Sequence, residues 1–132
     1  MKYKFRAYHK KKERLVDVLE IDFENNVVTL TIETDGDDEY YWWSSTCHLD
    51  EVELIQFTGL TDVNGVKIYE GDIITSEDNF NKGKLVYRYG CFQIKYGREK
   101  YKLLINTAYP KVIGNIYQHK HLLKENEENG SN

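Results

Sequence analysis

Apolar and polar residues alternate with a period of two along much of this chain, which is the pattern of β-strands with one buried face. Near the start, Tyr3, Phe5 and Ala7 alternate with lysine and arginine. Residues 15–23 and 27–33 are two further candidate strands, and the two asparagines between them suit a hairpin turn because asparagine tolerates positive φ. The first part of the chain therefore predicts an antiparallel meander.

The C-terminal half shows the same alternation more regularly. Residues 85–89, 92–96 and 101–105 alternate between apolar and polar side chains, and turns that contain glycine separate them. Residues 112–117 predict a closing strand, and residues 118–123 a single helical turn. Short strands at this spacing are typical of a small barrel.

The stretch 56–75 carries the clearest turn signals. Asn64-Gly65 lies between two apolar runs, which is the strongest short-range indication of a hairpin. Glu70-Gly71-Asp72 indicates a second turn shortly afterwards. Residues 51–57, just before, predict a short strand, although their apolar spacing also fits a helix.

Three motifs occur in a fixed order along the chain. They are FRAY at 5–8, FTGLTDVNGVKIYEGDII at 57–74 and VIGNIYQHKHLL at 112–123. Together they resemble the YopX family over nearly the whole chain. The resemblance implies a small protein carried by phages and prophages, mostly β, with an SH3-like C-terminal half and no established activity. The aromatic and acidic segment 35–43 departs from the family pattern.

These observations predict a mainly β protein in two parts. An N-terminal β meander, residues 1–55, is expected to pack on an SH3-like small barrel formed by residues 56–123. Residues 124–132 are polar and are expected to form a disordered tail.

Composition narrows the class of protein further. The 132 residues carry a formal net charge of −4, so the overall charge favours no class of partner. No apolar run approaches the ~18 residues that cross a membrane, and the N-terminus lacks the apolar core of a signal peptide. We therefore expect a cytoplasmic protein, in which Cys47 and Cys91 are free thiols.

Two histidine-containing pairs suggest chemistry at first sight. His119 and His121 would share a face on a strand, but no third ligand lies nearby and zinc sites require more donors, so ordinary surface histidines are favoured. Cys47 and His48 are adjacent, and neighbours on an extended chain point to opposite faces. A thiol nucleophile with its base is therefore not favoured.

Glu70 and Asp72 form a possible pair of carboxylates for acid–base catalysis. Turn formation is favoured instead, since aspartate accepts hydrogen bonds from nearby backbone N–H groups and glycine supplies unusual φ. We therefore predict a non-catalytic protein with neither cofactor nor metal.

The predicted function is an oligomeric assembly or interaction module whose partners are a second copy of itself and an unknown phage or host protein. Neighbouring aromatic residues on a strand face opposite ways, so one side is expected to meet a partner. A basic N-terminal strand and an acidic segment offer complementary charge, either between chains or within one. The predicted interface residues are Tyr3, Phe5, Tyr40, Tyr41, Trp42 and Trp43.

The alternative function is binding of single-stranded nucleic acid by the small barrel. Tyrosines interleaved with basic residues stack bases and neutralise phosphates, but the same alternation is typical of a barrel core, and the net charge is acidic. The basic N-terminal stretch 2–14 is a second region able to follow phosphates. The predicted contact residues are Tyr87, Arg88, Tyr89, Phe92, Lys95 and Tyr96.

Overall fold

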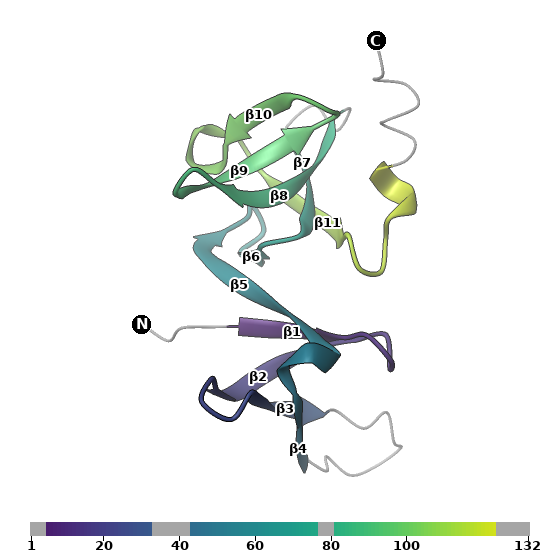
Figure 1. The fold of residues 1–132 in the computed structure, drawn as a ribbon. Helices are drawn as coiled ribbons and strands as arrows, with labels where there is room; N and C mark the ends of the chain where they lie inside the picture. Colours follow the sequence, from purple (N-terminus) through teal and green to yellow (C-terminus); the bar gives the residue numbers. More distant parts are fainter. Residues whose placement is uncertain (1–4, 33–42, 77–80, 124–132) are drawn as a thin grey trace. The chain divides into compact units, whose positions relative to one another are not determined.

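The structure, a computed structural model, describes residues 5–32, 43–76 and 81–123. The regular structure of these residues is mostly antiparallel strand, which confirms the mainly β prediction (Figure 1). The chain divides into two compact units, residues 1–56 and 57–132, and the boundary falls within one strand. The predicted tail, 124–132, lies outside the described residues. No helix in the described ranges is long and apolar enough to cross a membrane.

The first unit is an antiparallel sheet with the strand order β4-β3-β2-β1-β5. A 3-10 turn, η1, precedes β5, and the second half of β5 belongs to the second unit. The elements are β1 (Phe5–His9), β2 (Arg14–Asp22), β3 (Val27–Ile32), β4 (Trp43–His48), η1 (Leu49–Glu51) and β5 (Val52–Thr61).

The core of the first unit follows the predicted alternation. Ala7, Val28, Leu30 and Val52 are buried together, each from a strand position that points to the same interior. β1 is paired on both sides over 6–9, with β2 and with β5. Strand pairing between this part of β1 and a neighbouring chain is therefore not available, because its hydrogen-bonding edges are already occupied.

Local geometry in the first unit differs from the sequence prediction at two places. The β2–β3 connection has four residues, and of its two asparagines only Asn26 takes a positive φ, of 56°. Asp22 stabilises it by accepting the Asn25 N–H at 3.1 Å. Before β5, Glu51 accepts the His48 N–H at 2.8 Å and closes η1. The segment 51–57 is thus a strand preceded by one short helical turn.

The second unit contains a five-stranded antiparallel sheet with the order β10-β9-β8-β7-β11, and a hairpin formed by β6 with the end of β5. The described residues form a sheet that ends at β10 and β11, and closure into an SH3-like barrel stays a prediction. The elements are β6 (Lys67–Tyr69), β7 (Asp72–Thr75), β8 (Lys82–Arg88), β9 (Cys91–Tyr96), β10 (Lys100–Leu103), η2 (Leu104–Asn106) and β11 (Lys111–Asn115).

One face of this sheet forms the core of the second unit. Leu85 and Ile94 pair across β8 and β9 and are buried with other aliphatic side chains. Gly83 allows the strands to lie close, because a Cβ there would overlap the Ile94 side chain and lie 2.8 Å from the Lys95 carbonyl oxygen. Successive side chains of a strand point to opposite faces, so the residues of β8, β9 and β10 that alternate with the core residues lie on the other face of the sheet.

The hairpin turns are placed as predicted but differ in type. The β5–β6 turn closes through a Gly65 N–H bond to the Asp62 carbonyl, and Gly65 rather than Asn64 takes a positive φ, of 81°. The Asp62 N–H donates to the Val66 carbonyl at 2.7 Å, so these two residues enclose a three-residue loop, 63–65, with a glycine bulge. The two-residue turn with two positive φ angles is instead Tyr89-Gly90, between β8 and β9.

Candidate functional site

Two of the three motifs, 57–74 and 112–123, meet around Asp62, a buried carboxylate in the β5–β6 turn. Its oxygens accept N–H bonds from Asn64 and Val66 at 2.8 Å each and from Val112 at 3.0 Å. Burial alone would raise the pKa of Asp62, but these three donors and the nearby Lys111 outweigh burial and lower the pKa. Asp62 therefore ties the central motif to the last strand and serves the scaffold.

A second junction joins the turn before β7 to the segment after β11. Gly71 has a φ of 87°, and its carbonyl accepts the Ile116 N–H at 2.8 Å. A Cβ at Gly71 would lie 2.9 Å from the Tyr117 ring, so only glycine fits here. Asp72 accepts the Tyr69 N–H at 2.8 Å, as its predicted turn role requires, while burial raises the pKa of Glu70.

The third motif folds around Asn115 and His119. Asn115 Oδ1 accepts N–H bonds from Tyr117 and Gln118, and His119 Nδ1 accepts the Asn115 N–H at 3.1 Å. A Cβ at Gly114 would lie 2.8 Å from that same Nδ1, so glycine leaves room for the imidazole. The His119 ring is thus used as a structural acceptor.

Of the side chains considered for catalysis or metal binding, His119 and His121 form an edge-on ring pair. His119 and His121 have ring centroids 6.3 Å apart, and no group of three metal-ligating side chains occurs within residues 5–32, 43–76 and 81–123. Cys47 is half-buried and His48 exposed, and burial raises the pKa of the Cys47 thiol. Most motif side chains that form hydrogen bonds, such as those of Asp62 and Asp72, bond to backbone groups, and Asn115 also donates to the Gln118 side chain.

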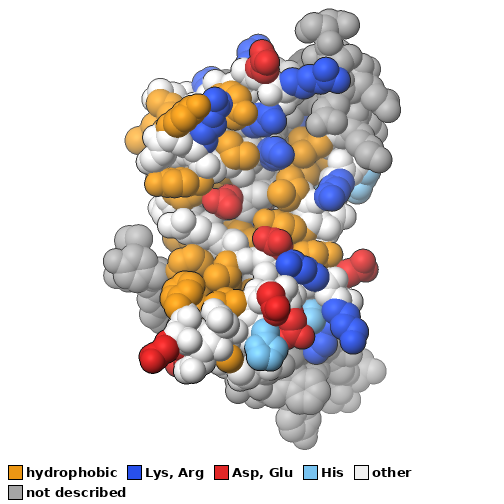
Figure 2. All heavy atoms as spheres, viewed as in Figure 1, with side chains coloured by type: hydrophobic (Ala, Val, Ile, Leu, Met, Phe, Trp, Pro, Cys, Tyr) orange, Lys and Arg blue, Asp and Glu red, His pale blue; other side chains and the backbone are white. Residues whose placement is uncertain are grey.

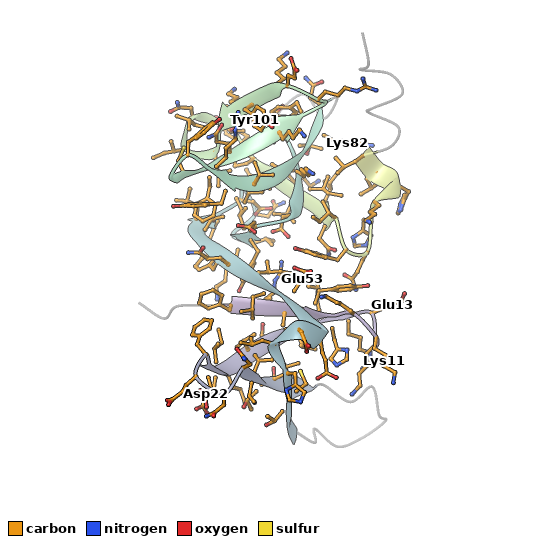
Figure 3. All side chains as sticks on the ribbon, in the orientation of Figure 1. Lys11, Glu13, Asp22, Glu53, Lys82 and Tyr101 are labelled. Carbon is orange, nitrogen blue, oxygen red and sulfur yellow. The ribbon has the colours of Figure 1, made fainter. Side chains whose placement is uncertain are left out.

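The surface of interest is the outward face of β8–β10, which we call the basic face. Strand register places Lys84 opposite Lys95, and Lys95 opposite Tyr101, in one row across three strands. Lys82 and Arg88 occupy the same face of β8 by alternation. Lys and Arg side chains gather over this part of the surface in Figure 2, and Figure 3 labels Lys82 and Tyr101. The basic face consists of Lys82, Lys84, Arg88, Lys95 and Tyr101.

Arg88 lies between two tyrosines on this face. Its guanidinium carbon is 3.8 Å from the Tyr101 ring centroid and 4.6 Å from that of Tyr89. Lys95 Nζ is 5.9 Å from the Tyr101 centroid. An Arg88 N–H also donates to the Tyr89 hydroxyl at 3.4 Å, which raises the pKa of Arg88 and lowers that of Tyr89. The result is a set of planar groups beside three lysines.

The six predicted nucleic-acid contact residues do not share one face. Arg88 and Lys95 lie on the basic face, and Tyr89 lies in the adjoining turn, 84% exposed. The remaining three lie on the other face, where Phe92 and Tyr96 pack on buried aliphatic residues, and Tyr87 packs edge-on against Phe92 at 5.1 Å while remaining 55% exposed. Those three are Tyr87, Phe92 and Tyr96. Sequence reasoning missed Tyr101, because only the pairing of β9 with β10 reveals its neighbours.

Charge is divided unevenly between the two units. Residues 1–56 hold seven Lys/Arg and 13 Asp/Glu, and residues 57–132 hold 11 and nine, so the net charges are −6 and +2. Within residues 82–102, seven Lys/Arg stand against one Glu, a net charge of +6. In the first unit, by contrast, Lys10 pairs with Glu53 at 3.6 Å. The overall acidity therefore conceals a strongly basic segment.

Most of the predicted interface residues fall outside the described ranges. Tyr3, Tyr40, Tyr41 and Trp42 are in this group, together with the acidic segment 35–39. Phe5 begins β1 and is half-buried. Trp43 begins β4, whose only partner among the described strands is β3.

The fold and surface define a small antiparallel β protein whose motif residues build turns and whose second unit carries a row of cations on one face of its sheet. The sequence model described as "YopX protein" matches residues 4–124, and the chain therefore belongs to the YopX family. This confirms the resemblance drawn from the three motifs.

A solved structure extends the comparison of folds. The chain is similar to the crystal structure of protein EF1440 from Enterococcus faecalis, with a TM-score of 0.64 and 22% sequence identity. The match covers 93% of this chain and 99% of the other, so the fold is shared over nearly the whole length. No curated protein matches the sequence.

Proposed function

We propose that this protein is a non-catalytic accessory protein of a phage or prophage that acts in the cytoplasm as an oligomeric interaction module. The observation that carries the proposal is the basic face, where three lysines and Arg88, all half-buried, share one side of β8–β9 within a segment, residues 82–102, whose net charge is +6. Polar residues of the family motifs, such as Asp62 and Asn115, are engaged with backbone groups instead. A binding surface accounts better than a reaction centre for polar motif residues that stabilise the backbone and cations that gather on another face.

Self-association is the second part of the proposal. β4 stands at the end of the strand order in the described part of the chain, and such an edge offers unpaired backbone groups to another strand. Trp43 begins this strand and Trp42 precedes it, so a contact here combines strand pairing with aromatic burial. Two identical edges also suit a symmetric dimer.

Light scattering coupled to size-exclusion chromatography tests self-association. At tens of micromolar protein we expect a mass that is a multiple of the 15.6 kDa chain. The double variant Trp42→Ala, Trp43→Ala should shift the mass toward one chain, while its circular dichroism stays that of a β protein. A single-chain mass for the unaltered protein refutes this part of the proposal.

A further inference from the structure

We propose that the basic face binds single-stranded nucleic acid, with Tyr89, Arg88 and Tyr101 stacking on bases and the lysines of β8 and β9 contacting phosphates. This inference rests on the proposed function, because it assigns a chemical class of partner to the same surface. Two independent features of the surface support it, namely the repulsion between two lysines on adjacent strands and the exposed tyrosine ring beside Arg88.

The first feature is an unfavourable charge arrangement. Lys84 and Lys95 are directly opposite each other on adjacent antiparallel strands. Like charges in such a pair destabilise a sheet. Among residues 82–102 the single acidic residue, Glu99, lies in the β9–β10 turn rather than in a strand. A bound phosphate between the two ammonium groups would remove their repulsion.

The second feature is the conformation of Tyr89. It has a φ of 53° and is 84% exposed, at a turn position that asparagine or glycine occupies at lower cost. A bulky residue in this region of φ is uncommon, so the turn itself does not favour tyrosine at this position. Its ring contacts Arg88, which in turn lies over the Tyr101 ring. The exposed tyrosine therefore extends a row of planar groups toward solvent.

Planar groups beside lysines distinguish nucleic acid from other polyanions. Aromatic rings and arginine guanidinium planes stack on the unpaired bases of single strands, while lysines follow the phosphates. An acidic protein would use the charges of the basic face but would gain nothing from stacking. Bases in a duplex are already stacked on each other, so a flat face of this kind favours single strands.

Fluorescence anisotropy of the full chain with labelled oligothymidylate tests the inference. If three phosphates are neutralised, affinity should fall roughly 20-fold when salt rises from about 50 to about 200 mM. Tyr89→Ala should weaken binding about fivefold or more, and Arg88→Lys, which keeps the charge but loses the plane, should also weaken it. Lys95→Gln should reduce both the affinity and the salt dependence.

The chain offers matched controls for these variants. Tyr109 is also exposed and has a φ of 50°, but it precedes β11, so Tyr109→Ala should leave binding unchanged. Lys102 pairs with Ile94 and therefore belongs to the face opposite Lys95, so Lys102→Gln should have the smaller effect of the two. An equal loss in each variant and its control would overturn the assignment, because it would show a general effect of charge or ring removal.

Three further outcomes would also overturn it. They are absence of binding at low salt, equal affinity for polyglutamate with no loss in Tyr89→Ala, and binding only to vesicles of anionic lipid. If oligonucleotides fail to bind but charge reversal on the basic face still abolishes capture of a protein partner, the proposed function stands and the nucleic-acid assignment falls. If charge reversal on the basic face weakens neither oligonucleotide binding nor capture of a protein partner, the proposed function and the nucleic-acid assignment are both wrong.

Discussion

At the scale of single residues, Asp62 shows how the family motif stabilises the fold. Its carboxylate accepts three backbone N–H bonds, from Asn64, Val66 and Val112, while it is buried. An asparagine in its place keeps one acceptor oxygen and turns an amide donor toward another donor. We expect Asp62→Asn to lower the free energy of unfolding by about 1–3 kcal/mol, measured by urea denaturation near neutral pH.

The same carboxylate predicts a dependence on pH. Because the pKa of Asp62 is lowered from its ordinary 3.8, its contribution is present above that value and is lost as pH falls through the folded-state pKa. The stability difference between the unaltered chain and Asp62→Asn should therefore shrink as pH falls from about 6 to about 3. A difference that stays constant or widens on acidification would contradict this role.

Gly114 offers a second test at this scale. A Cβ there would lie 2.8 Å from His119 Nδ1, the atom that accepts the Asn115 N–H. Gly114→Ala should cost about 1–3 kcal/mol in chemical denaturation, because the imidazole must move. Adding His119→Ala should cost less than the sum of the two single changes, since it removes the group that clashes. If the effects of the two single changes on the free energy of unfolding simply add in the double variant, Gly114→Ala does not act through the His119 side chain.

At the scale of elements, a substitution in the Tyr89-Gly90 turn should affect stability and oligonucleotide binding differently. We expect Tyr89→Asn to leave stability unchanged or to raise it by up to about 1 kcal/mol, since asparagine relieves the strain of a positive φ. The same variant should lose oligonucleotide affinity, because it removes an exposed ring. Thermal denaturation measured alongside anisotropy tests both. A variant that unfolds more easily would show that the tyrosine serves the hairpin.

The positions of most strands could be predicted from the sequence, but their pairing and the types of some turns could not. Alternation located most strands, because one buried face demands it in any sheet. It did not say which strands pair, and pairing alone brings Lys95 beside Tyr101 and separates Arg88 from Phe92. Turn type was equally hidden at Tyr89, since a tyrosine carries no turn signal, whereas Gly65 was located correctly from its neighbours.

At the scale of the whole molecule, the net charge of −4 is misleading, because the two units differ in sign. A net charge of −6 in residues 1–56 and +2 in residues 57–132 means that anionic partners are attracted to one unit and repelled by the other. The candidate surface was thus only partly predictable: two of its cations, Arg88 and Lys95, followed from sequence, and its aromatic centre required the register.

The most direct test of the central claim is a quantitative pull-down from cells in which a prophage or phage is active. The full chain is compared with two double variants, Lys84→Glu with Lys95→Glu on the basic face and Lys100→Glu with Lys102→Glu on the opposite side of β10. Both variants change the net charge equally. We predict that partners are lost from the first and retained by the second. Equal retention, or equal loss, would contradict a binding function of the basic face.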